Sequence, residues 1–163
     1  MLIRTLCAAL LVTCGAAQAA DTVIRHRTPG SDFPIAAAVE VPAGKTTIYV
    51  SGAVPPVVDE KAERGSIASF GDTRTQTLGV LRNIERSLKR MGLGMGDVVK
   101  MQVFLVGDPS KGGRMDFDGF MQGYREFFGT AEQPNLPARA VMQVAGLVAP
   151  GWLVEIEVTA VRP

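Results

Sequence analysis

The pattern of apolar and polar positions is clearest near the C-terminal end of the chain. Residues 135–144 and 153–158 each alternate with a period of two, and a Pro-Gly pair lies between them. Such alternation is typical of β-strands that bury one face. We therefore predict a hairpin, or a pair of neighbouring strands, in this part of the chain.

Charged residues occupy defined positions in these two strands. Arg139 follows a proline by two residues and lies at the mouth of the first strand, whereas Glu155 and Glu157 share one face of the second. An arginine near carboxylates suits a site for a small carboxylate and a water molecule. The alternative is an ion pair between Arg139 and one glutamate at an interface.

Two other stretches have helical periodicity. The first begins at Asp72 and repeats apolar residues at every third or fourth position until Gly92, which is placed like a helix C′ glycine. The second runs from about residue 116 to 128 and is closed by Gly129. We interpret its apolar stripe as a contact between helix and sheet. The stripe consists of Phe117, Phe120, Met121, Tyr124, Phe127 and Phe128.

The remaining apolar runs predict further strands. Residues 46–52 and 97–106 are rich in β-branched and aromatic side chains, and weaker candidates lie at 22–27 and 35–41. This order of elements predicts an α+β domain whose two helices lie on one face of a mixed sheet. Because the other face has no helix to cover it, we expect a homo-oligomer.

The N-terminal residues have the features of a signal peptide. Arg4 is followed by an apolar stretch at 6–12 and by a small-x-small site that ends at Ala19. We predict a signal peptide over residues 1–19, cleavage after Ala19, and a single domain over 20–163 that is periplasmic or secreted. Cys14 raises a lipoprotein alternative, although the residue before it is a threonine.

Cleavage would change the chemistry available to the chain. Both cysteines, Cys7 and Cys14, would be lost, and the 17 basic side chains would fall to 16 against 16 acidic ones. A balanced charge gives no reason to expect nucleic acid or a membrane surface as a partner. The one histidine, His26, has no second His or Cys to join it, so we expect no metal site and no Ser-His-Asp triad.

Arg139 therefore stands out, together with Glu155 or Glu157, Ser51 and Tyr124. A guanidinium binds a carboxylate through two parallel hydrogen bonds, and a glutamate can hold or deprotonate water. Such a set could hydrolyse a C=N bond in a substrate that carries a carboxylate. It could equally bind a carboxylated ligand without reaction.

Several motifs follow one another in order along the chain. They are Tyr49-Val50-Ser51-Gly52, the helix 76–91, Asp97-Val98-Val99-Lys100, Tyr124-Arg125-Glu126-Phe127-Phe128, Pro137-Ala138-Arg139 and Val154-Glu155-Ile156-Glu157. In this order they resemble the motifs of the Rid (YjgF-like) family of reactive-intermediate imine/enamine deaminases. The resemblance covers the chain from Tyr49 onward and implies a chorismate-mutase-like fold, a homotrimer and ligand clefts between subunits.

The resemblance also implies an activity, the hydrolysis of 2-imino acids and their enamine tautomers to 2-keto acids and ammonia without a cofactor. It implies that Arg139 holds the substrate carboxylate, that Glu155 is associated with the hydrolytic water, and that Ser51-Gly52 lies near the cleft. The alternative is a non-catalytic trimer that binds small carboxylated metabolites. Three departures from the family pattern favour this alternative, namely Ala53, Ala140 and Met121.

Overall fold

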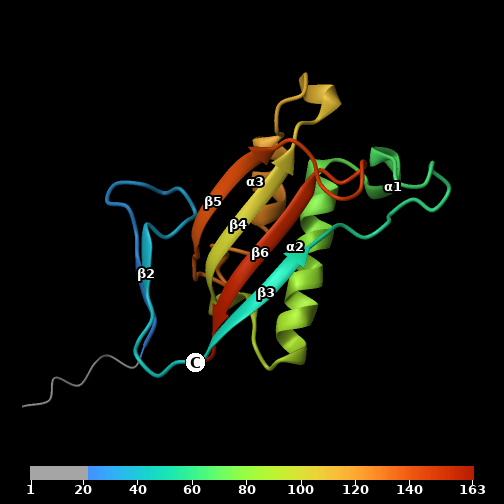
Figure 1. The fold of residues 1–163 in the computed structure, drawn as a ribbon. Coiled ribbons are helices and arrows are strands. Elements are labelled where there is room, and N and C mark those ends of the chain that lie inside the picture. The colour runs from blue at the N-terminus through green and yellow to red at the C-terminus, as the bar shows by residue number, and fades with distance from the viewer. Residues whose placement is uncertain (1–21) are drawn as a thin grey trace, which may run out of the picture.

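The computed structural model describes residues 22–163 and is built on a four-stranded mixed sheet. The strand order is β3 (Thr47–Ala53), β6 (Val154–Val161), β4 (Val98–Val106) and β5 (Ala138–Val144) (Figure 1). Only β4 and β5 are parallel, and the other pairs are antiparallel. The predicted mixed sheet is thus confirmed, whereas the predicted signal peptide over residues 1–19 lies outside the described residues.

The prediction that β5 and β6 form a hairpin or a neighbouring pair is wrong. Strand β4 lies between them and pairs with both, because the chain leaves β5, crosses the end of β4 and returns on its far side. A period of two determines which side chains share a face of a strand, but it carries no information about which strand lies alongside.

Helices cover one face of this sheet, as predicted (Figure 1). Helix α2 (Thr73–Arg90) begins where Asp72 accepts a hydrogen bond from the Thr75 amide and ends before Gly92, whose φ is 71°. Helix α3 (Phe117–Tyr124) packs against α2 but ends four residues before the predicted 128. The short helices not predicted are α1 (Ile67–Phe70), η1 (Met95–Asp97) and η2 (Pro109–Lys111).

The hydrophobic core lies between the helices and the sheet. Side chains from α2 and α3 pack on alternate residues of β4 and β6, each removed almost completely from solvent. Full burial of one such side chain contributes about 1.5–3 kcal/mol before entropy is counted. The best buried of these residues are Val80, Leu81, Ile84, Leu88, Met101, Val103, Leu105, Phe120, Val154 and Ile156.

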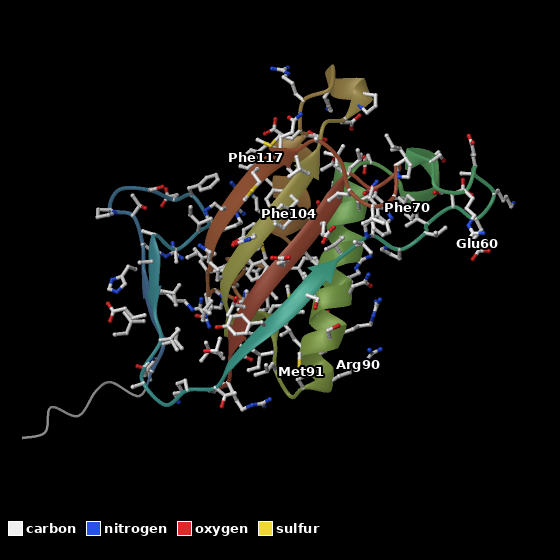
Figure 2. All side chains as sticks on the ribbon, viewed as in Figure 1. Glu60, Phe70, Arg90, Met91, Phe104 and Phe117 are labelled. Carbon is white, nitrogen blue, oxygen red and sulfur yellow. The ribbon has the colours of Figure 1, made fainter. Side chains whose placement is uncertain are left out.

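None of the helices in residues 22–163 covers the opposite face of the sheet, which faces the viewer in Figures 1 and 2. It carries Phe104, half-buried, and Tyr49, whose side chain is 83% exposed. A shallow groove of about 100 Å³ runs over β3, β6 and β4 beside Tyr49, Gln102 and Glu157. The prediction of an uncovered sheet face is therefore confirmed, while the oligomer inferred from it stays a prediction.

A two-stranded ribbon of β1 (Ile24–His26) and β2 (Ala38–Glu40) stands beside β5 (Figure 1). Arg25 fixes it to the main body by donating hydrogen bonds to the carbonyls of Gly96, Val98 and Leu136 at 2.7–2.9 Å. The loop between β1 and β2 reaches α3. The ribbon thus brings an N-terminal loop next to the beginning of β5, where Arg139 lies.

Candidate functional site

Arg139 lies on the helix-covered face of the sheet, in a cage of aromatic side chains. Its partner on β4 is Met101, which is fully buried. The guanidinium carbon is 4.2 Å from the ring centre of Tyr124, 5.1 Å from that of Phe120 and 5.6 Å from that of Phe33. These distances are typical of cation–π contacts, which partly replace the water that the guanidinium has lost.

The Arg139 guanidinium has no acidic partner among the described residues. Nη2 donates to the Met121 sulfur at 3.2 Å, a weak acceptor, and the buried Nη1 has no hydrogen-bond partner in the described chain. Burial lowers the pKa of Arg139, although the Tyr124 hydroxyl opposes this shift. The ion pair with a glutamate, which was the alternative interpretation of Arg139, is not formed within one chain.

Glu155 lies on the open face of the sheet. It pairs with Phe104 of β4, three residues along that strand from Met101, the partner of Arg139. Residues directly opposite one another on neighbouring strands point to the same face, and the face alternates along a strand. Arg139 and Glu155 therefore point to opposite faces, and a single chain does not bring them together.

Gly52, of the predicted Ser51-Gly52 pair, lies against Glu155. The pairing of β3 with β6 is irregular between Val50 and Ala53, and there the Glu155 side chain lies directly over Gly52. A Cβ added at Gly52 would overlap the Glu155 Oε1 atom, so a larger residue at this position would require the Glu155 side chain to shift. Ser51, the preceding residue, is exposed. The glycine at position 52 thus leaves room for the Glu155 carboxylate in its present orientation.

Tyr124 lies beneath Arg139 and is fully buried. Its hydroxyl donates a hydrogen bond to the Pro34 carbonyl at 2.9 Å. Burial raises the pKa of Tyr124 to about 12, against the opposing effect of the nearby Arg139 charge. Within this chain Tyr124 supports the guanidinium and fixes the loop between β1 and β2.

Two members of the cage were not predicted as site residues, Phe33 and Phe120. Phe120 was interpreted as part of a helix–sheet stripe, and it does pack in the core while also facing Arg139. Phe33 is the one aromatic residue in an otherwise polar turn, directly before a proline. An aromatic residue alone in a polar turn indicates that its side chain has a partner elsewhere in the fold. The sequence does not show which strand this turn reaches.

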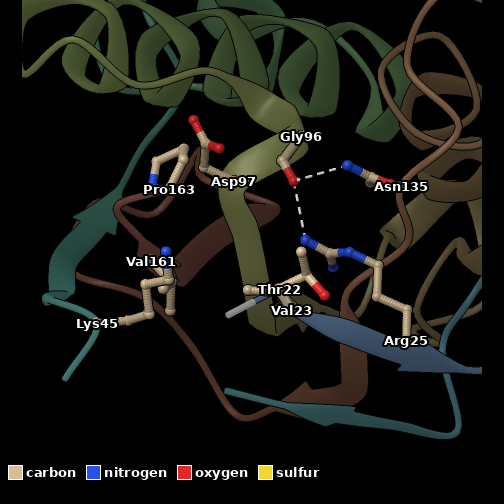
Figure 3. Close-up of a pocket in the computed structure, with 9 residues that line it drawn as sticks. All are labelled: Thr22, Val23, Arg25, Lys45, Gly96, Asp97, Asn135, Val161 and Pro163. Carbon is tan, nitrogen blue, oxygen red and sulfur yellow. Dashed lines mark hydrogen bonds between the residues drawn. The ribbon is translucent and has the colours of Figure 1, made fainter. Parts of the chain in front are cut away.

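A polar hollow of about 260 Å³ at the ribbon does not include Arg139 in its lining (Figure 3). It is lined by Arg25, Lys45 and Asp97, among others. Its polar groups are used within the fold, since Arg25 and Asn135 both donate to the Gly96 carbonyl and Asp97 accepts from the Gly94 amide. We interpret this hollow as part of the contact that fixes the β1–β2 ribbon to the main body of the protein.

His26 is exposed on β1 and lies 2.6 Å from Glu40 on β2. Within residues 22–163 no group of three or more His, Cys, Asp or Glu side chains is gathered closely enough to hold a metal ion. Over the same residues, none of the helices combines the length and the apolar character needed to cross a membrane.

Comparison with known proteins identifies the family. The model of the family described as Endoribonuclease L-PSP matches residues 33–162, which is most of the chain. The chain therefore belongs to this family, which includes the YjgF, RutC and Rid proteins, and the resemblance noted in the sequence is confirmed.

Its relatives include proteins named as deaminases. The chain is 31% identical over 141 residues to the 2-iminobutanoate/2-iminopropanoate deaminase of Salmonella typhimurium, covering 86% of this chain and 97% of the relative. It is 30% identical over 144 residues to a RutC family protein of Pyrococcus abyssi, covering 88% and 98%. The family thus includes reactive-intermediate deaminases.

Solved structures share the fold. The structure of Escherichia coli TdcF with bound serine is 30% identical, with a TM-score of 0.56 over 84% of this chain and 94% of that one. A Rid family protein from Yersinia pestis superposes with a TM-score of 0.61 over 85% and 98% at 24% identity, which bears on the fold alone. The predicted α+β class is therefore confirmed.

Proposed function

We propose that the protein hydrolyses 2-imino acids and their enamine tautomers to 2-keto acids and ammonia. In this proposal Arg139 anchors the substrate carboxylate and Glu155 positions the water. The observation that carries the proposal is the Arg139 guanidinium, which is largely buried and has no acidic partner among the described residues. A cation in that state is complementary to an anionic ligand.

The energetics favour a carboxylate as that ligand. Removing an unpaired charge from water costs several kcal/mol, and the cation–π contacts recover only part of it. A carboxylate would supply the missing acceptor at Nη1 and a stronger one than the Met121 sulfur at Nη2, in the two-pronged geometry that arginine prefers. The rigid cage would hold the guanidinium in one orientation, which suits the positioning of a reactive carbon.

The chemistry follows from a carboxylate beside a polarised C=N bond. Glu155 accepts a proton as its water attacks the carbon of the protonated imine, which gives a hydroxyl and an amine on one tetrahedral carbon. Glu155 then returns this proton to the amine nitrogen, the C–N bond breaks and ammonia leaves, and the hydroxyl loses its proton to form the keto group. One water is consumed for each ammonia released, and no oxidant or reductant is needed.

A complete site requires two chains, because Arg139 and Glu155 point to opposite faces of one sheet. A homotrimer in which the open face of one subunit meets the Arg139 edge of the next would supply both groups at each interface, an arrangement that closes on itself with three identical sites. Relatives named as deaminases, and the serine bound to Escherichia coli TdcF, support a ligand that carries a carboxylate.

Export is part of the proposal. Residues 1–19 have the pattern of a cleavable signal peptide, so the proposed place of action is the periplasm or the exterior of the cell. There the protein would meet imines formed by the oxidation of amino acids outside the cytoplasm.

An ammonia-release assay tests the activity. An amino-acid oxidase generates 2-imino acids in place, and the release of ammonia is compared for the mature protein, Arg139→Ala and Glu155→Gln. We expect both variants to lose at least tenfold in rate, with ligand binding lost only in Arg139→Ala. Glu157→Gln, on the same face, tests the alternative glutamate, and Arg82→Ala, on the exposed side of α2, is the matched control. Full activity in Glu155→Gln would remove Glu155 from the mechanism.

A non-catalytic binder is the second candidate, and Met121 favours it. The Met121 sulfur is 3.2 Å from the guanidinium and offers neither a strong hydrogen bond nor a proton to a reacting group. Under this candidate the protein binds carboxylates, Arg139→Ala abolishes binding, and no imine is hydrolysed faster than in buffer. The same assay, paired with calorimetric binding of pyruvate, separates the two functions.

A further inference from the structure

Phe33 is the only exposed member of the cage around Arg139. Its side chain is 41% exposed, whereas Phe120 and Tyr124 are fully buried and Met121 is 6% exposed. Among these cage residues, Phe33 is thus the one that a molecule from solvent can contact directly, and its ring centre lies 5.6 Å from the guanidinium carbon. A group attached to a bound carboxylate would have the Phe33 ring beside it.

The structure fixes the backbone on which Phe33 stands. Directly after it, the Pro34 carbonyl accepts a hydrogen bond from the buried Tyr124 hydroxyl. Two residues further, the Ala36 amide donates to the Pro137 carbonyl at 3.0 Å, and Ala36 pairs with Ala138 in a bridge. The first anchor is on α3, and the second is at the beginning of β5, next to Arg139. Together they set the position of the backbone that follows Phe33.

The Phe33 ring also has an aromatic neighbour. It stacks on Phe117 of α3 with the two ring centres 6.5 Å apart and an angle of 14° between the ring planes. Phe33 and Phe117 together form an apolar wall that begins 5.6 Å from the Arg139 guanidinium carbon and extends toward solvent.

From this geometry we infer that Phe33 determines the specificity of the site for the substrate side chain, and that the site selects 2-imino acids and carboxylates with a large apolar group, aromatic ones above all. The inference rests on the proposed function of Arg139 as the carboxylate anchor. A ligand ring would pack against the exposed part of the Phe33 ring, a contact that small or polar side chains cannot make. Phe33 is here a specificity residue, not a catalytic one.

The test measures the affinity of the mature protein for phenylpyruvate and for pyruvate by titration calorimetry, which does not depend on turnover. For the wild type we expect phenylpyruvate to bind at least tenfold more tightly. Phe33→Ala should weaken phenylpyruvate about tenfold and leave pyruvate within about twofold, because an aromatic pair contributes an effect of this size. Phe33→Leu should give an intermediate loss, and Val148→Ala, a change at a residue 91% exposed in a distant loop, should give none.

The outcomes separate this inference from the proposed function. An equal loss for both ligands in Phe33→Ala would show a merely structural role and overturn the inference, as would an unchanged ratio of the two affinities. Failure of the wild type to bind either keto acid would instead overturn the anchor role of Arg139, and the inference with it. Far-ultraviolet circular dichroism and thermal unfolding of each variant check that the loop variants remain folded.

Discussion

Replacement of Arg139 by methionine should stabilise the protein while it abolishes carboxylate binding. Methionine has a similar length and no charge, so it fills the aromatic cage without needing acceptors. The change removes a largely buried guanidinium whose Nη1 has no partner in the described chain and whose Nη2 reaches only a sulfur. Stability and function would then be opposed at this one residue.

The magnitude follows from the contacts. An unpaired buried donor costs about 1–3 kcal/mol, and desolvation of the charge adds to that. Against this stand the cation–π contacts, about 2 kcal/mol for the closest, with Tyr124 at 4.2 Å, and less for Phe120 and Phe33. The difference predicts that Arg139→Met gains about 1 kcal/mol, equivalent to a rise of about 3 °C in Tm for a chain of this size.

Thermal unfolding at matched protein concentration, with and without pyruvate, measures both effects. The wild type should gain about 2.7 kcal/mol at a pyruvate concentration one hundred times its Kd, because the ligand binds the folded state alone. Arg139→Met should start from the higher Tm and show no gain. A variant destabilised by 1 kcal/mol or more would refute the reasoning, because it would show that Arg139 serves the fold and is not held ready for a ligand.

Two further predictions concern Gly52 and Tyr124. Gly52→Ala should displace the Glu155 carboxylate and lower the deamination rate at least tenfold in the ammonia assay, whereas Gly146→Ala, where an added Cβ meets nothing within 4 Å, should not change it. The Tyr124 pKa is raised from its ordinary 10.0 to about 12, so the unfolded chain loses this proton first as the pH rises. Stability should fall by about 2 kcal/mol between pH 10 and 12 in denaturant titrations. In Tyr124→Phe this pH-dependent loss of stability should be absent. At neutral pH the same variant should be about 1 kcal/mol less stable than the wild type, because it lacks the hydrogen bond to the Pro34 carbonyl.

Local patterns predicted the elements well because local physics determines them. Asp72 predicted the beginning of α2 because its side chain accepts a hydrogen bond from the first turn. Gly92 predicted the end of α2 because it adopts a positive φ. The end of α3 was predicted too late, since Phe127 and Phe128 continue the apolar stripe in turns after the helix has ended. An apolar stripe shows which side chains are buried, and side chains beyond the last helical hydrogen bond of α3 are buried as well.

The arrangement of the site depends on pairing between strands, which the sequence does not contain. Arg139 and Glu155 were each identified, but the insertion of β4 between their strands, and hence their opposite faces, required the register. The contact of Gly52 with Glu155 depends on the irregular pairing of β3 with β6. The cage residue Phe33 comes from a loop more than one hundred residues before Arg139. The periodicity of apolar residues carries no information about such a long-range contact.

Mixed assemblies test most directly the claim that Arg139 of one subunit works with Glu155 of its neighbour. Arg139→Ala and Glu155→Gln chains, each inactive alone, are co-expressed in equal amounts with different tags, and assemblies that carry both tags are isolated. If each site takes Arg139 from one chain and Glu155 from the next, every trimer that contains both chains has about one site in three with both groups intact. We predict about a third of the wild-type rate of ammonia release. No recovery in assemblies that contain both chains would contradict a site shared between subunits.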